Sequence, residues 1–343
     1  MSDLWSSISL KGLYLKNRLV MPPMALDIAS ESGEVTEKII EHYRSRAKMG
    51  DAKQSPGLII VEHTYVSPEG IAHPNQLGIY DDFLIPGLQR LVEAIHETGV
   101  PVGIQLSHAG ARGLKQSQGP SSIPLPFLKR FNRGGDSENA QKINIPTQLE
   151  NEDISKIVKD FAQGAERAQK AGFDMIDIHG AHGYLLNQFF SPLTNHRSDG
   201  YGGHLYNRMR FPLEVFAAIR TTVGADYPIF YRLGADDRIS GGNTIEDGIK
   251  AAVILEKSGV DCLDLSGGVG GYIKNGPEGF FSYMAEAVKE HTSLPVLLTG
   301  GIKTGHFANQ LVSKGHADLV GVGRAILADP TWVNRAWLET GNF

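Results

Sequence analysis

Eight short apolar runs recur along the chain, and this repetition limits the possible folds more than any other feature. Between the runs, apolar residues return at three- and four-residue spacing, which is typical of helices that bury one face. Gly99, Gly172, Gly259 and Gly315 stand shortly before the following run, where a left-handed residue commonly ends a helix. The runs are residues 18–21, 58–61, 102–106, 175–178, 229–233, 262–265, 296–298 and 319–322.

Eight strand–helix repeats predict an α/β protein with the fold of a (β/α)8 TIM barrel. A doubly wound sheet is the alternative, but it commonly has a Gly-rich GxGxxG turn after an early strand. The first run here ends in Pro22-Pro23-Met24, which cannot form that turn. Residues 4–17 alternate around Lys11-Gly12 and predict an N-terminal hairpin. Because the composition does not change along the chain, we expect a single domain over residues 1–343.

Two connections are longer than usual for an α/β fold. Residues 107–149 follow the third strand and residues 180–206 follow the fourth, so both are expected on the active-site side, as a lid or a subunit contact. The helix pattern at 154–168 is preceded by Asn151 and Asp153, which are candidate N-caps.

Charge and cysteine content exclude several classes of partner. Lys and Arg number 33 against 38 Asp and Glu, and a net charge of −5 argues against nucleic acid or an anionic membrane as partner. Cys262 is the only cysteine, so a disulfide within the chain and a thiolate iron–sulfur site are both excluded. The N-terminus has no secretory signal pattern and no run of 18 apolar residues occurs, so we expect a cytoplasmic protein.

The strongest chemical signal follows the fourth strand, where His179, His182 and Tyr184 fall within six residues. Imidazole N–H groups can stabilise a carbonyl oxygen that gains charge, and a tyrosine can deliver a proton. A His-x-x-His zinc site is the alternative, but a third ligand at suitable spacing is not evident, and we predict no metal. The residues could also simply be satisfied polar groups at a barrel rim.

Glycines after the last two strands indicate a phosphate site. Residues 299–302 read TGGI and residues 321–324 read GVGR, so Gly301, Gly323 and Arg324 would approach a phosphate of a substrate or of FMN. Tight turns beside a surface arginine are the alternative. Gln105 and Arg232 end the third and fifth strands, where an amide would suit a pyrimidine edge and a guanidinium would suit a reduced flavin.

At this level of detail the chain resembles the Old Yellow Enzyme family of FMN-dependent ene-reductases, most nearly its bacterial, single-domain branch. The matching text spans nearly the whole chain in the family's order. It comprises LKNRLVMPPM (15–24), EHYRSRAKMG (41–50), LIIVEHTYVSPEG (58–70), VGIQLSHAG (102–110), GFDMIDIHGAHGYLLNQFFSPLTNHRSDGYGG (172–203), NRMRFPLEV (207–215), TGGI (299–302) and GVGRAILADP (321–330).

The resemblance implies a set of site residues. FMN would lie across the strand ends, with reduced nicotinamide from NAD(P)H above it in the same pocket. His179 and His182 would bind the activating oxygen of the substrate, and Tyr184 would donate the proton. The residues implied at the flavin are Pro23, Met24, Ala25, His63, Gln105, Arg232, Gly301, Gly323 and Arg324.

Two of these positions depart from the family's pattern. Ala25 stands where relatives often have Thr or Cys, and the missing donor predicts a lower flavin potential. His63 stands where relatives commonly have Gly or Ala, so it would crowd the pocket or contact the substrate.

The function expected is that of an FMN-dependent oxidoreductase that takes hydride from NAD(P)H. Its substrates would be α,β-unsaturated carbonyl or nitro compounds, whose activated C=C bond it would reduce. The alternatives are another FMN-barrel dehydrogenase and a non-catalytic flavin electron carrier or redox sensor. Because members of the family often associate, a homo-oligomer is left open.

Overall fold

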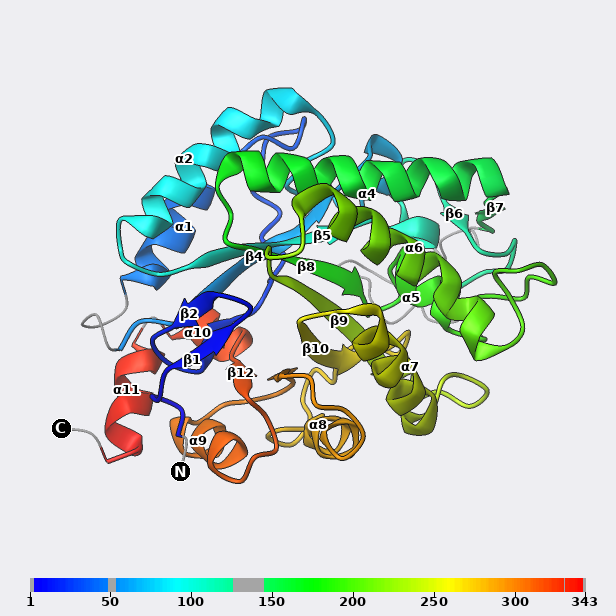
Figure 1. Ribbon diagram of the computed structural model, residues 1–343. Coiled ribbons are helices and arrows are strands. Elements are labelled where there is room, and N and C mark those ends of the chain that lie inside the picture. Colours follow the sequence, from blue (N-terminus) through cyan, green and yellow to red (C-terminus); the bar gives the residue numbers. More distant parts are fainter. Residues whose placement is uncertain (1–2, 49–53, 126–144, 330, 342–343) are drawn as a thin grey trace, which may run out of the picture.

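Eight parallel strands close into a barrel in this computed structural model, which describes residues 3–48, 54–125, 145–329 and 331–341 (Figure 1). Around the barrel the order is β10-β11-β12-β3-β4-β5-β8-β9, so the first and last strands of the barrel, β3 and β12, pair with each other. The predicted TIM barrel is therefore confirmed. The strands are β3 (Leu19–Met21), β4 (Leu58–Tyr65), β5 (Val102–Ser107), β8 (Met175–Gly180), β9 (Ile229–Asp236), β10 (Cys262–Gly267), β11 (Val296–Thr299) and β12 (Leu319–Gly321).

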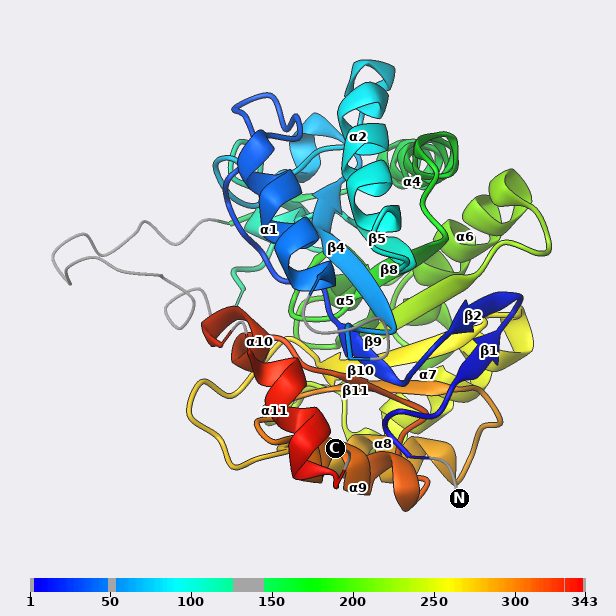
Figure 2. The same cartoon turned by 90° about the vertical axis from the view of Figure 1, so that its left-hand side faces the viewer.

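Helices surround the barrel on its outside (Figures 1 and 2). Their buried stripes pack on the outward-facing Val, Ile and Leu side chains of the strands and form the main core. The helices are α1 (Glu37–Ala47), α2 (Ile85–His96), α4 (Asn151–Ala171), α5 (Leu185–Phe190), α6 (Leu205–Val223), α7 (Ile245–Ser258), α8 (Ser282–Lys289), α9 (Gly305–Ser313), α10 (Arg324–Ala328) and α11 (Trp332–Glu339).

The predicted N-terminal hairpin is also present and covers one end of the barrel. Strands β1 (Ile8–Leu10) and β2 (Leu13–Leu15) pair antiparallel across Lys11 and Gly12, which have φ of 48° and 81°. Positive φ at both residues is the backbone of a tight hairpin turn. Hairpin leucines pack against inward side chains from the beginnings of the barrel strands, such as Leu58 and Phe230. The strand carboxyl ends therefore remain as the end available for chemistry.

The helix ends follow the expected chemistry with one correction. Gly172 and Gly259 cap α4 and α7 in the left-handed conformation, and Gly99 and Gly315 also have positive φ. The N-cap of α4 is Glu150, not Asn151 or Asp153. Its side chain accepts from the backbone of the third helical residue, Asp153, whose own carboxylate accepts from Glu150 N. The two candidates lie one and three residues after the true cap, because Glu is an uncommon N-cap.

Both long connections leave the barrel on the side of the strand carboxyl ends. The first contains η3 (Gly110–Arg112) and strands β6 (Gln118–Gly119) and β7 (Thr147–Gln148), and its residues 126–144 lie outside the described part of the chain. The second contains α5.

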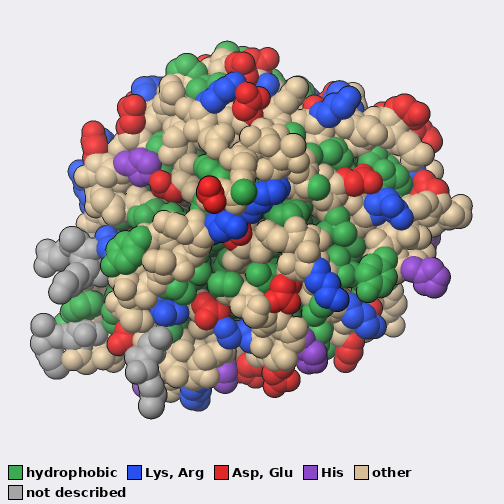
Figure 3. Space-filling view, viewed as in Figure 1, with side chains coloured by type: hydrophobic (Ala, Val, Ile, Leu, Met, Phe, Trp, Pro, Cys, Tyr) green, Lys and Arg blue, Asp and Glu red, His purple; other side chains and the backbone are tan. Residues whose placement is uncertain are grey.

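Acidic and basic side chains are mixed over the face drawn in Figure 3. Within the described ranges, none of the helices is long and apolar enough to cross a lipid bilayer.

Candidate active site

The inward face of the barrel changes from apolar to polar along the strands. Side chains two residues apart share a face of a strand, so the inward set can be followed from the apolar layer at the strand beginnings. That layer contains Met175, Phe230, Cys262 and Leu297. Two residues further along the same strands stand Asp177, Arg232, Asp264 and Thr299, and one more step in β8 and β10 reaches His179 and Ser266.

The middle polar layer is a buried network of carboxylates, an amide and a guanidinium. Gln105 Nε2 donates to Asp177 Oδ2 at 2.6 Å, and Arg232 Nε lies 3.3 Å from Asp264 Oδ2. Burial raises the pKa of Asp264 to about 6 although Arg232 and Thr299 oppose the shift, and burial with the charge of Asp264 raises the pKa of Asp177 well above its usual range. These two aspartates were missed by the sequence analysis, although an Asp inside an apolar strand was an available signal.

His179 and His182 lie together at the end of β8. Their ring centroids are 5.3 Å apart, and His182 Nε2 lies 2.7 Å from Ser266 Oγ on β10. Burial is the main cause that lowers the pKa of both imidazoles well below the usual range, and the charge of Arg232 lowers them further. Both rings are therefore neutral at neutral pH, so each offers one N–H donor and one acceptor nitrogen.

The turn that follows is held by side chains of α5. His182 and Gly183 both have positive φ, of 57° and 70°, which reverses the chain directly after the strand. Gly183 N donates to Asn187 Oδ1 at 2.8 Å, and Gln188 Nε2 donates to Gly183 O at 2.7 Å. Tyr184 is thereby returned over the barrel mouth, where its ring centroid is 4.5 Å from that of His179.

Three further basic side chains reach Tyr184 from other segments, and the sequence analysis did not bring them together with it. His63 Nε2 and His73 Nε2 lie 3.5 Å and 3.4 Å from Tyr184 Oη. The guanidinium carbon of Arg112 is 4.8 Å from the Tyr184 ring centroid, and Arg112 Nη1 donates to His182 O at 2.6 Å. In β4 the pairing register with β5 shifts between Val61 and His63, and such a bulge re-aims the side chains beyond it.

His108, by contrast, serves the loop. It is buried, Gly110 N donates to its Nδ1 at 3.1 Å, and burial lowers its pKa to about 4. A Cβ on Gly70 would come within 2.6 Å of the His108 ring, so the two segments pack closely. These contacts give His108 a structural role in the loop.

The residues expected at the flavin edge follow β3. Pro23 is buried, Met24 and Ala25 are half-buried, and Leu26 N donates to Glu62 Oε2 at 2.8 Å. The carboxyl group of Glu62 is buried beside this loop, and burial raises its pKa to about 8. Glu62 therefore anchors the loop, whereas the effect of Ala25 on a flavin potential stays a prediction.

The glycines proposed at a phosphate are fixed by close packing. Gly301 has φ of 71°, and a Cβ there would come within 2.4 Å of the Phe280 ring; a Cβ on Gly323 would lie 2.6 Å from Met24 Sδ. Arg324 Nη1 donates to Lys274 O at 2.7 Å, and its guanidinium carbon is 6.0 Å from the Phe280 ring centroid. The ends of β3, β11 and β12 therefore meet, as a shared phosphate site would require.

The chemistry of the mouth fits a flavin mononucleotide. Within the described residues, the buried His179 Nδ1 makes no hydrogen bond and Arg232 Nε has only its ion pair with Asp264 at 3.3 Å, which leaves donors or acceptors for a bound ligand to satisfy. A cationic guanidinium suits the electron-rich edge of a reduced flavin, and backbone around Gly301 and Gly323 suits its phosphate. In the described ranges, no group of three His, Cys, Asp or Glu side chains is arranged to hold a metal ion.

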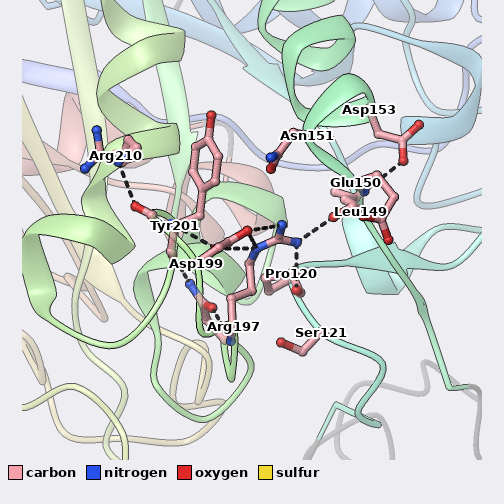
Figure 4. Close-up of polar contacts among 12 residues, drawn as sticks. Pro120, Ser121, Leu149, Glu150, Asn151, Asp153, Arg197, Asp199, Tyr201 and Arg210 are labelled. Atoms are coloured by element: carbon pink, nitrogen blue, oxygen red, sulfur yellow. Dashed lines mark hydrogen bonds and ion pairs between the residues drawn. The ribbon is translucent and has the colours of Figure 1, made fainter.

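A buried arginine joins the two long connections above the barrel (Figure 4). Arg197, from the connection after β8, donates from Nη1 to Pro120 O at 3.2 Å and also to Leu149 O, both in the connection after β5. Its Nε and Nη2 donate to Asp199, at 3.0 Å and 2.6 Å. The segment that carries His182 and Tyr184 is thereby fixed to the segment that carries Arg112.

Residues 3–340 match the model of the NADH:flavin oxidoreductase / NADH oxidase family. The chain belongs to this family. It is 40% identical over 341 residues to an NADPH dehydrogenase of Halalkalibacterium halodurans. The aligned residues cover 98% of this chain and 95% of that protein. It is 38% identical to an NADH oxidase of Thermoanaerobacter brockii, over 97% of this chain but 50% of that protein, so it spans about half the length of that relative.

A solved structure gives the same result. The old yellow enzyme homologue from Zymomonas mobilis superposes with a TM-score of 0.82 at 27% identity, over 99% of this chain and 94% of that one. The resemblance to the Old Yellow Enzyme family is thus confirmed. As a member of the NADH:flavin oxidoreductase family, the protein is an oxidoreductase of the Old Yellow Enzyme type, with FMN as its cofactor.

Proposed function

We propose that the protein reduces the activated C=C bond of α,β-unsaturated carbonyl or nitro compounds at the expense of NAD(P)H. The observation that carries the proposal is the meeting of two neutral, buried imidazoles with a tyrosine at one strand end. The ring of His179 is 5.3 Å from that of His182 and 4.5 Å from that of Tyr184. When bound, FMN supplies the hydride transfer between nicotinamide and substrate.

His179 and His182 would bind the activating oxygen of the substrate. Negative charge grows on this oxygen as the β-carbon receives hydride, and N–H groups that are already oriented stabilise it without reorganisation. Ser266 orients His182 through the 2.7 Å contact at Nε2. Because both rings are buried and neutral, the hydrogen bonds to the substrate oxygen come from uncharged imidazole N–H groups.

Tyr184 would place a proton on the α-carbon. Tyr184 is 4% exposed as a whole residue, so the proton is delivered out of contact with bulk water. On the cofactor side, we propose that the flavin is held by Pro23, Met24, Ala25, His63, Gln105, Arg232, Gly301, Gly323 and Arg324.

An anaerobic half-reaction tests this function. The purified holoprotein is reduced with NADPH or NADH, and the flavin absorbance is followed after 2-cyclohexenone is added. Bleaching by the nucleotide followed by recovery with the enone is the expected result. Bleaching that the enone does not reverse, with nitroalkenes equally inert, would contradict it.

The alternative of a flavin electron carrier makes a different prediction in the same experiment. A carrier would be reoxidised by a one-electron acceptor but not by the enone. The double variant His179→Ala/His182→Ala separates the cases further. For the proposed reductase it slows enone-driven reoxidation by on the order of 100-fold, while reoxidation by ferricyanide is unaffected.

A further inference from the structure

Tyr184 is surrounded by more basic groups than the binding of a substrate oxygen requires. Its Oη lies 3.5 Å from His63 Nε2 and 3.4 Å from His73 Nε2, and Arg112 faces its ring. His63 comes from β4, whereas His73 and Gln76 belong to the connection between β4 and α2. Of the two imidazoles at Oη, His63 is buried and His73 is half-buried, so His73 has the greater contact with solvent.

Gln76 determines which nitrogen of His63 carries hydrogen. Ala72 N donates to Gln76 Oε1 at 2.7 Å and Gln76 Nε2 donates to His63 O at 2.9 Å, so the amide has one orientation. Gln76 Nε2 is also 2.7 Å from His63 Nδ1, which must therefore accept. In a neutral imidazole the other nitrogen then carries the hydrogen. His63 Nε2–H thus faces Tyr184 Oη as a donor.

The direction of this hydrogen bond has a consequence for Tyr184. An oxygen that accepts from His63 directs its own hydrogen to another acceptor. His73 Nε2 is such an acceptor when no substrate is bound. The three groups therefore form a chain that runs from buried His63 through Tyr184 to half-buried His73.

We propose that His73 returns a proton from solvent to Tyr184 after each reduction, while Gln76 and His63 hold the phenol in the donating orientation. The proposal rests on the proposed ene reduction. The α-carbon takes the proton of Oη and leaves a phenolate, which the N–H of His63 and the charge of Arg112 stabilise. His73 takes up a solvent proton as an imidazolium, transfers one from Nε2 to Oη, and returns to the neutral ring. One hydride and one solvent proton are consumed in each cycle.

The variant His73→Asn tests the proposal in the holoenzyme, with His306→Asn on the exposed face of α9 as the matched control. Tyr184 begins each experiment protonated. A single reoxidation of the prereduced variant by cyclohexenone should therefore keep the wild-type rate. Steady-state turnover should fall on the order of 100-fold, as expected for loss of a proton-transfer group. Added imidazole should restore it, and the control should match the wild type throughout.

Three outcomes would overturn the proposal. Steady-state turnover equal to that of the wild type would show that Tyr184 is reprotonated by another route. Equal slowing of the single turnover and the steady state would indicate a structural role for His73. A steady-state loss that imidazole does not restore would exclude proton return. His73→Gln is measured in parallel in case the Asn variant does not fold. Failure of the proposed function is distinct, because the wild-type protein itself would then not be reoxidised by the enone.

Discussion

At the scale of single residues, environment decides what a side chain can do. Tyr184 is one of 11 tyrosines in the chain, and its role is set by neighbours at positions 63, 73, 112 and 179. Cationic and imidazole groups around a phenol stabilise the negative charge that remains after proton donation. The same phenol on the surface would have no such assistance.

Replacement of Tyr184 by Phe should remove the proton donor and leave the packing in place. We expect enone-driven reoxidation to slow by on the order of 100-fold or more, whereas reduction by NADPH keeps its rate. Stopped-flow absorbance in the two half-reactions measures this. Tyr206→Phe is the control, because Tyr206 is 72% exposed on α6. Equal slowing of both half-reactions in the Tyr184 variant would argue against the assignment.

Glu62 gives a pH-dependent prediction. Burial raises its pKa from 4.5 to about 8, so the folded protein holds this proton more tightly than the unfolded chain. The contribution to stability is complete below pH 4.5 and is lost as the pH rises through about 8. Relative to Glu62→Gln, the free energy of unfolding of the wild type should fall by up to about 1.4 kcal/mol per pH unit in this window.

Urea unfolding of the holoprotein from pH 5 to pH 8 measures the difference between the two proteins. Glu93→Gln, at an exposed position of α2, is the control and should follow the wild type at every pH. A constant difference between wild type and Glu62→Gln across the window would show that the carboxyl group is not held protonated by the fold.

At the scale of elements, the site depends on how loops are fixed to the barrel. The bulge in β4 re-aims His63, the reversal at His182 and Gly183 returns Tyr184 over the mouth, and Arg197 joins the two long connections. Each of the three devices positions groups of the proposed site, and small errors in such positions lower rates substantially.

Arg197→Met should therefore affect both stability and catalysis. Loss of a buried guanidinium removes the ion pair with Asp199 and leaves the carbonyls of Pro120 and Leu149 without this donor, at a cost of about 2 kcal/mol. Denaturant titration should show this loss, and the enone half-reaction should slow more than the nucleotide half-reaction. Arg210→Met is the control, since Arg210 is exposed and its hydrogen bonds, to Gly200 O at 2.7 Å and to Asn207 Oδ1 at 3.5 Å, stay within its own segment (Figure 4). A Met variant as stable as this control would remove the structural role proposed for Arg197.

At the scale of the whole molecule, barrel closure joins segments that are remote in the chain. Pairing of β12 with β3 places Gly323 beside Met24, and Trp5 packs on Trp337 of α11 with ring centroids 5.0 Å apart. A ligand that contacts the ends of both β3 and β12 binds only while these two strands are paired. Its binding therefore shows whether the barrel is closed.

Removal of FMN should lower the melting temperature, and FMN added back should restore it in a concentration-dependent way. At a free concentration of 1,000 times Kd, the stabilisation is about 4 kcal/mol. Riboflavin lacks the phosphate and should stabilise less. In Arg324→Met the advantage of FMN over riboflavin should shrink. Thermal unfolding with each ligand measures this, and an unchanged advantage would contradict the phosphate site at Gly301, Gly323 and Arg324.

The sequence by itself determined the barrel, its hairpin and the cluster of candidate site residues after the fourth barrel strand. Apolar strands ending in Gly, Pro or His have local signatures, and the HGAHGYL segment keeps His179, His182 and Tyr184 within six residues. Local pattern is enough for such features because strand alternation, helix periodicity and turn chemistry act over a few residues. The predicted position of the α4 N-cap was wrong because the true position is occupied by a residue type that is uncommon at N-caps.

Only the tertiary structure decided which polar groups meet. Asp177 and Asp264 come together through strand pairing in a closed barrel, and Glu62 is buried by a loop that follows a different strand. His63, His73 and Arg112 reach Tyr184 from positions 72 to 121 residues away in the chain. Burial and long-range contact set the protonation of these groups, and neither is a local property of the sequence.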